Sequence, residues 1–132
     1  MTVLLIDLGN TALKWATAET VDDPRTYVHG GHDVLPEELI QEWLRFKPCQ
    51  VVGCMVSSET LALTLTRFFN QYGIHWEWLR SEKVFNGSFK LVNTYEDYQQ
   101  LGSDRWHAAI GATSLFPGES LLVSQMGTAT TL

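Results

Sequence analysis

The amino-acid sequence predicts a mixed α/β fold, in which helices cover the faces of a β-sheet. Two observations carry this prediction. The first is the apolar run TVLLI at residues 2–6, which is typical of a strand buried on both faces. The second is a later alternation of helical and strand patterns, which is typical of a sheet with crossover helices. The predicted order is β-β-β-α-β-α-β, followed by one further helix and one further strand.

The stretch DLGNTALKW at residues 7–15 follows the first strand and predicts a hairpin. Gly9-Asn10 is a turn pair in which both residues tolerate a positive φ, so we expect the chain to reverse there. Residues 12–19 are the predicted returning strand. Residues 26–32 are the predicted third strand, and the strand pattern is weak at its end. The chain therefore begins with three meandering strands.

The middle of the chain alternates between helix and strand patterns. Pro36 opens a helical pattern with apolar residues on one face, and Pro48 prevents its continuation. Residues 50–56 are apolar and predict a second buried strand. Ser58 is placed to cap the next helix, and Gly73 is placed to end it.

The remaining elements complete the pattern. Residues 74–79 alternate as a strand does, whereas residues 80–100 are polar and predicted to be irregular. A helix is predicted from Ser103 to Leu115, because Pro117-Gly118 follows it, and residues 120–125 form a last predicted strand. Three strands followed by alternating helices and strands are typical of a ribonuclease-H-like, or actin-like, lobe with a mixed sheet.

Composition excludes several classes of function. The chain has 132 residues, of which 45% are hydrophobic, so it can bury a core. Its net charge of −6 argues against a nucleic-acid or anionic-membrane surface. Cys49 and Cys54 match neither a disulfide framework nor a zinc site. The start lacks a secretory signal, and no uncharged apolar run reaches the roughly 18 residues of a membrane span. We expect a cytoplasmic protein with neither nucleic-acid nor membrane partners.

The first candidate site is the tip of the predicted hairpin, Gly9, Asn10 and Thr11. Such a tip exposes backbone N–H groups that lack a ladder partner, which is typical of an anion-binding nest. Asp7 at the strand end could hold magnesium through water, because this ion prefers a carboxylate together with phosphates. Lys14 adds positive charge or is simply solvated. The alternative is an ordinary hairpin in which Asp7 bonds its own turn.

Two further motifs follow. Residues 127–131, GTATT, succeed an apolar strand as the first motif does, and their hydroxyls predict either a second phosphate loop or a polar turn. Residues 101–106, LGSDRW, place an acid beside a base as a helix begins. One interpretation is a helix start with Ser103 as its cap. The other makes Asp104 a general base and Arg105 a clamp for a carboxylate or phosphate.

Together these motifs resemble the type III pantothenate kinases, also described as the Bvg accessory factor family, of the acetate and sugar kinase and actin superfamily. The resemblance runs from LLIDLGNTALKW through LGSDRWHAAIGA to GTATTL. It implies a first actin-like lobe at residues 1–117, and the opening strand and phosphate loop of a truncated second lobe at residues 118–132. It also implies ATP-dependent phosphorylation of pantothenate to 4′-phosphopantothenate, the first step of coenzyme A biosynthesis, by a homodimer.

The resemblance also implies roles for residues. Those implied to bind ATP phosphates are Asp7, Leu8, Gly9, Asn10, Thr11, Ala12, Leu13, Lys14, Gly127 and Thr128, with Asp7 also holding Mg²⁺ through water. Those implied to bind pantothenate are Tyr95, Gly102, Ser103, Asp104 and Arg105, with Asp104 as the catalytic proton acceptor. Gln125 stands where the family usually carries an aspartate that binds a monovalent cation, K⁺ or NH₄⁺. The chain stops inside the motif that opens the second lobe, so we expect it to be inactive alone.

Two other functions stay open. One is a non-catalytic regulatory accessory factor of the same family, and the other is an actin-like nucleotide-binding module. A binding module needs phosphate loops, but it does not need Asp104 next to Arg105 and a substrate tyrosine, so these residues favour a kinase. His29 and His32 flank two glycines, and we interpret them as loop histidines rather than metal ligands.

Overall fold

The computed structural model describes residues 2–56, 59–126 and 130–131. The chain divides into two compact units, Met1–Leu79 and Arg80–Leu132. The predicted lobe boundary at residue 117 stays a prediction. The first unit contains β1 (Thr2–Leu8), β2 (Ala12–Thr17), η1 (Ala18–Thr20), β3 (Arg25–Val28), α1 (Glu37–Arg45), β4 (Pro48–Met55), α2 (Glu59–Gln71) and β5 (His75–Trp78). The second contains β6 (Val84–Asn86), β7 (Lys90–Val92), η2 (Tyr98–Gln100), α3 (Ser103–Leu115), β8 (Gln125–Met126) and β9 (Thr130–Thr131).

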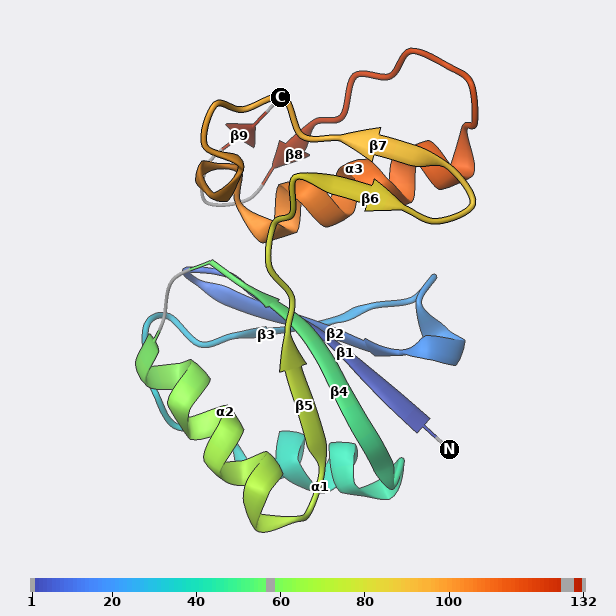
Figure 1. The fold of residues 1–132 in the computed structure, drawn as a ribbon. Helices are drawn as coiled ribbons and strands as arrows, with labels where there is room; N and C mark the ends of the chain where they lie inside the picture. Colours follow the sequence, from blue (N-terminus) through green and yellow to red (C-terminus); the bar gives the residue numbers. More distant parts are fainter. Residues whose placement is uncertain (1, 57–58, 127–129, 132) are drawn as a thin grey trace. The chain divides into compact units, whose positions relative to one another are not determined.

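The first unit is built on a five-stranded sheet with the order β3-β2-β1-β4-β5 (Figure 1). β1 runs antiparallel to β2 and parallel to β4, and β5 is parallel to β4. The sheet is therefore mixed, as the sequence predicts, and the order β-β-β-α-β-α-β is confirmed. Because β1, β4 and β5 are parallel, their carboxyl ends meet at the same edge of the sheet.

One hydrophobic cluster fixes this unit. Leu4, Ile6 and Leu8 alternate along β1 with less buried residues, so they share one face of the sheet. They pack in the same cluster as Trp43 of α1 and Phe69 of α2, so both helices cover this face. Burying each such side chain stabilises the fold by about 1.5–3 kcal/mol. This packing makes the sheet a rigid support for the polar residues at its edge.

The ends of both helices follow from their sequences. Pro36 is the N-cap of α1, and Lys47 adopts a positive φ of 48° after its end, so that Pro48 can begin β4. Gly73 ends α2 with a φ of 67°, as predicted. The predicted cap Ser58 lies outside the described residues.

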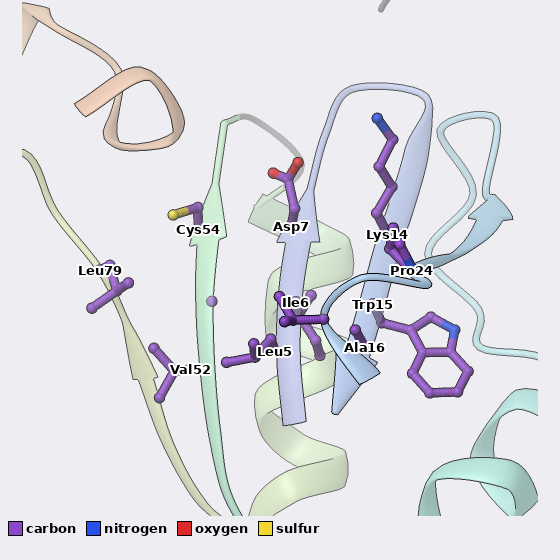
Figure 2. A pocket seen from close by; sticks show the side chains of 12 residues that line it. Leu5, Ile6, Asp7, Lys14, Trp15, Ala16, Pro24, Val52, Cys54 and Leu79 are labelled. Carbon is purple, nitrogen blue, oxygen red and sulfur yellow. The ribbon is translucent and has the colours of Figure 1, made fainter. Parts of the chain in front are cut away.

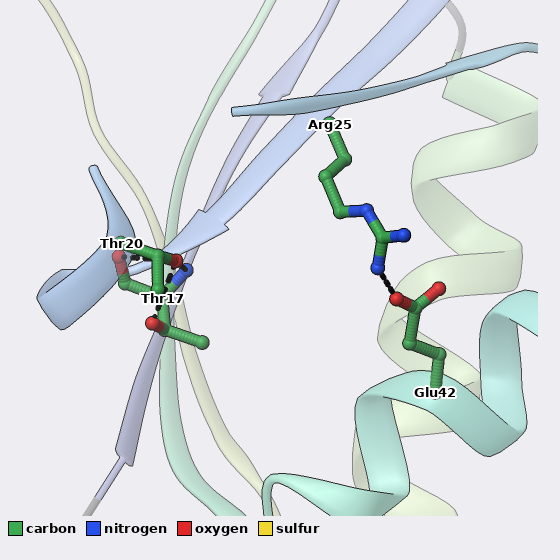
Figure 3. A network of polar contacts seen from close by, with 4 residues as sticks. All are labelled: Thr17, Thr20, Arg25 and Glu42. Atoms are coloured by element: carbon green, nitrogen blue, oxygen red, sulfur yellow. Dashed lines mark hydrogen bonds and ion pairs between the residues drawn. The ribbon is translucent and has the colours of Figure 1, made fainter. Parts of the chain in front are cut away.

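Polar contacts tie the edge of the sheet to α1 and close the end of β2 (Figure 3). Arg25 of β3 forms an ion pair with Glu42 of α1, and its guanidinium lies 5.6 Å from the Trp15 ring centroid. After β2, the hydroxyls of Thr17 and Thr20 lie 2.8 Å apart, and the Thr17 N–H donates to Thr20 Oγ1. These contacts tie β3 to α1 and η1 to the end of β2.

The second unit departs from the sequence prediction in two places. The segment predicted to be irregular contains the antiparallel hairpin of β6 and β7. The strand predicted at residues 120–125 is wrong, because only Gln125–Met126 forms a strand. A strand needs a hydrogen-bonded neighbour, and residues 120–124 have none in the described part of the chain. Leu122 is accordingly 80% exposed.

Helix α3 confirms its prediction at both ends, since it runs over Ser103–Leu115. Trp106 of this helix is buried. Across the ranges that the structure describes, every helix falls short of the length and apolarity required to cross a bilayer.

Candidate active site

The hairpin bend, defined as Gly9, Asn10 and Thr11, joins β1 to β2. The Gly9 N–H donates to the carbonyl of Ala12 at 2.9 Å, which closes the bend. The predicted reason for the turn is wrong, because neither Gly9 nor Asn10 has a positive φ. Space favours glycine instead, since a β-carbon at Gly9 would lie a tight 3.1 Å from the Ala12 carbonyl oxygen.

The bend is held from outside by residues of the loop after β3. His29 lies in this loop, as the sequence indicates, but its side chain is buried, with only 1% of its surface exposed. Its Nε2 lies 2.8 Å from the Gly9 carbonyl oxygen. The backbone N–H groups of His29 and Gly30 both donate to the carbonyl of Thr11 at 3.0 Å. Sequence spacing gave no sign of this contact, which joins segments far apart along the chain.

Two charged residues stand beside the bend. Asp7 and Lys14 are directly opposite each other in the antiparallel pair of β1 and β2, and both are exposed. Figure 2 shows both side chains extending from their strands towards the hairpin bend. Asp7 also pairs with Cys54 at the carboxyl end of β4. The edge of the parallel strands therefore presents a carboxylate, an ammonium group and small polar side chains.

A hollow of about 330 Å³ lies below these charges, on the sheet face opposite the core (Figure 2). Its apolar lining comes mainly from Leu5, Ala16, Val21, Pro24, Val52 and Leu79. Asp7 and Lys14 also line it. Leu8 and Leu13 of the implied phosphate set face the other way, since both side chains are fully buried in the core. They can contribute only backbone groups to a ligand.

The start of α3 carries the second group of predicted residues. Gly102 is its N-cap and Ser103 its first residue, so the interpretation of Ser103 as the cap is wrong. A β-carbon at Gly102 would lie 2.8 Å from Asp104 Oδ1, so a larger residue would push this carboxylate away. Asp104 is half-buried in the first turn, and Arg105 is exposed. A negatively charged side chain in the first turn interacts favourably with the helix dipole.

Tyr95 is held by a buried amide. Asn93 is 3% exposed, and its Oδ1 accepts a hydrogen bond from the Tyr95 N–H at 3.2 Å. Its Nδ2 donates to the carbonyls of Glu82 and Tyr98, at 3.3 and 3.1 Å. The Tyr95 side chain itself is 44% exposed. Asn93 is a residue that sequence reasoning missed, and it fixes the backbone from which the tyrosine projects.

The structure thus gathers the predicted residues in two groups, one in each unit. The stretch from Asp7 to Lys14 belongs to the first unit, and Tyr95 and residues 102–105 belong to the second. Gly127 and Thr128 lie outside the described residues, and Gln125 pairs with Thr131 through the backbone. No group of three or more potential metal-ligating side chains occurs within the described ranges.

A mixed five-stranded sheet with crossover helices and a polar bend at its edge is consistent with an actin-like, ribonuclease-H-like kinase fold. A family model described as type III pantothenate kinase matches residues 3–132. The chain belongs to the type III pantothenate kinase family.

Curated relatives agree with this assignment. A type III pantothenate kinase of Paraburkholderia phymatum is 34% identical over 141 residues, which cover 98% of this chain and 48% of the relative. One of Burkholderia cenocepacia is 38% identical, with the same coverage. One of Herminiimonas arsenicoxydans is 36% identical, over 98% of this chain and 52% of the relative. The chain spans about half the length of the curated relatives it matches.

Proposed function

We propose that this chain provides the phosphate-binding and pantothenate-binding parts of an ATP-dependent pantothenate kinase, which forms 4′-phosphopantothenate for coenzyme A biosynthesis. In this proposal residues 1–117 form the first lobe, and residues 118–132 open the second. The observation that carries the proposal is the position of the exposed Asp7 and Lys14 beside the hairpin bend, at the carboxyl ends of the parallel strands. Ligands of open α/β sheets bind beyond this edge.

The stretch from Asp7 to Lys14 is the proposed phosphate site, together with Gly127 and Thr128. The Lys14 ammonium would offset the negative charge of the phosphates, and the small residues of the bend allow close approach of the ligand. Asp7 fits a magnesium ion that also binds phosphate oxygens, because its carboxylate is exposed at the strand end. Bound magnesium would neutralise charge that develops on the transferred group. A monovalent cation at Gln125 is part of the proposal as well.

Asp104 is the proposed catalytic base. Its carboxylate accepts the proton of the pantothenate primary hydroxyl as that oxygen bonds to the γ-phosphorus of ATP, while the bond to the β,γ-bridging oxygen breaks and ADP leaves. Arg105 and Tyr95 are exposed on either side of this acid in sequence, and they are the proposed contacts of the pantothenate carboxylate and backbone. Gly102 and Ser103 complete the proposed substrate site.

The proposed setting is a cytoplasmic homodimer with ATP and pantothenate as its ligands, and with neither nucleic acid nor membrane as a partner. The net charge of −6 supports the absence of a polyanionic partner. This charge would repel both a phosphate backbone and an anionic bilayer.

The test is pantothenate phosphorylation with magnesium–ATP, by the 132-residue chain and by the product of the longest reading frame at its locus. In the form that is active, Asp104→Asn should lower kcat by about 10²- to 10⁴-fold, because a positioned base contributes that much. Glu96→Gln, at an exposed acid of the same unit, is the matched control and should leave kcat unchanged.

Inactivity of both folded forms would contradict the proposal and would favour the regulatory accessory factor. Binding of magnesium–ATP without any turnover would favour the nucleotide-binding module. Equal rates for Asp104→Asn and Glu96→Gln would remove Asp104 from the mechanism.

A further inference from the structure

We propose that His29 is a positioning residue, which in one neutral tautomer holds the hairpin bend in the conformation that binds phosphate. The inference rests on the proposed function of the bend, but it concerns a residue that neither the motifs nor the resemblance singled out. With 1% of its surface exposed, His29 does not contact a ligand itself. It acts through the backbone of Gly9 and Thr11.

The hydrogen bonds of the ring assign the tautomer. The Gly31 N–H lies 3.0 Å from His29 Nδ1, and a backbone N–H can only donate, so Nδ1 is the unprotonated acceptor. The proton of the neutral ring is then on Nε2, which donates it to the Gly9 carbonyl at 2.8 Å. A doubly protonated ring would lose the bond from Gly31. A single neutral form therefore satisfies both neighbours.

The bonds from His29 and Gly30 to the carbonyls of Gly9 and Thr11 are here called the clamp. The turn formed by residues 29–32 makes this clamp rigid. The His32 N–H donates to the His29 carbonyl at 3.0 Å, which closes the turn. Gly30 and Gly31 both have a positive φ, of 59° and 85°, which favours glycine at each position. This conformation directs the backbone N–H groups of His29 and Gly30 to the Thr11 carbonyl.

The hairpin bend needs such external support. Short hairpin loops that match the twist of their strands usually contain residues with a positive φ, and Gly9 and Asn10 have none. Its carbonyls at Gly9 and Thr11 are instead both bonded from the turn at His29. A phosphate site made of backbone groups depends on their exact placement, so loosening this clamp should reduce phosphate affinity.

Two variants of His29 separate its two side-chain bonds. In His29→Gln the amide nitrogen can take the place of Nε2 and still donate to Gly9. In His29→Asn the shorter amide can take the place of Nδ1 and accept from Gly31, but it does not reach Gly9. His32→Gln is the matched control, because His32 belongs to the same turn and its side chain is exposed.

The affinity for magnesium–ATP is measured by calorimetry on the folded 132-residue chain and its variants. His29→Asn should weaken binding by about three- to tenfold, as expected from one lost hydrogen bond. His29→Gln and His32→Gln should stay within about twofold of the unmodified chain. Equal affinities of the Asn and Gln variants would overturn the positioning role, since a merely structural histidine would not distinguish them.

Nitrogen-15 NMR of the ring tests the tautomer independently of any nucleotide. A spectrum at neutral pH with Nδ1 unprotonated and Nε2 protonated supports the inference, and a doubly protonated ring overturns it. If the unmodified chain binds no magnesium–ATP, the proposed function fails. Hydrogen exchange at the Gly9 amide then tests whether His29 holds the hairpin bend. Faster exchange in His29→Asn than in His29→Gln supports this role, and equal rates overturn it.

Discussion

The two units of the chain hold their candidate site residues by different means. In the first unit, one cluster of buried side chains from β1, β2, α1, β4 and α2 supports the sheet edge. In the second, Trp106 is the buried hydrophobic residue among those the structure describes. There, hydrogen bonds of the Asn93 side chain help to fix the backbone of the Tyr95 segment. The candidate site at the sheet edge thus rests on packing, whereas the Tyr95 segment depends on a polar network.

The units also share one device, which is a buried polar side chain bonded to the backbone of a candidate segment. His29 bonds the Gly9 carbonyl, and Asn93 bonds the Tyr95 N–H. Leaving a buried polar group without its partner costs about 1–3 kcal/mol, so each side chain strongly favours one backbone conformation. This comparison yields predictions that differ between the units.

The largest expected effect is in the core of the first unit. Phe69→Ala removes a fully buried ring that packs on Trp43, and it should lower the free energy of unfolding by about 3–5 kcal/mol. Urea denaturation measures this change. Leu63→Ala is the control on the same helix, since Leu63 is 50% exposed, and its effect should stay within about 0.5 kcal/mol. Similar losses for both variants would contradict the assigned core.

The next effect is in the polar network of the second unit. Asn93→Ala leaves the Tyr95 N–H and two carbonyls without this partner, and it should destabilise the unit by about 1–3 kcal/mol. Hydrogen exchange at the Tyr95 amide should become faster. Thr94→Ala, at the exposed neighbouring position, is the control and should leave the exchange unchanged. Unchanged exchange in Asn93→Ala would show that the network does not hold this segment.

Two glycines should respond in opposite directions. Gly73→Ala places a β-carbon on a residue with a φ of 67°, which should cost about 1–2 kcal/mol. Gly111→Ala fills open space within α3 and should stabilise the helix by about 0.5–1 kcal/mol. Thermal unfolding measures both. A stabilising Gly73→Ala would contradict the helix end described for the first unit.

The smallest effect is at the surface of the first unit. Arg25→Ala removes the exposed ion pair with Glu42, and the loss should be only about 0.2–1 kcal/mol. Raising the salt concentration should reduce the difference between Arg25→Ala and the unmodified chain. A loss as large as that of Phe69→Ala would mean that the sheet edge, rather than the core, supports this unit.

Sequence patterns predicted best what local residues determine. Helix α3 was predicted at both ends, because Pro117-Gly118 stops it and no proline interrupts it. The order of the elements along the chain followed from the apolar runs and the helices between them. Asp7 and the hairpin bend were predicted from a turn signal at a strand end, although the expected positive φ values were wrong.

Several misses involve partners distant in sequence or short elements. β6 and β7 have three residues each, and none of these residues is buried, so they carry no clear periodic signal. Residues 120–124 are apolar enough for a strand. Strand formation also depends on a neighbouring strand, and an apolar pattern does not show whether one is present. The burial of His29 arises from its contact with the bend, twenty residues earlier. Its glycine-rich surroundings indicated the loop in which it lies, but they gave no sign of its burial.

The most direct test of the account is a titration of the nitrogen-15-labelled chain with magnesium–ATP, followed by pantothenate, with amide chemical shifts as the readout. The account predicts that the nucleotide shifts the amides of Gly9, Asn10, Thr11 and Lys14, and that pantothenate then shifts those of Tyr95 and residues 102–105. Shifts confined to α1 and α2, or none at all in the folded chain, would contradict a phosphotransfer site built from these residues.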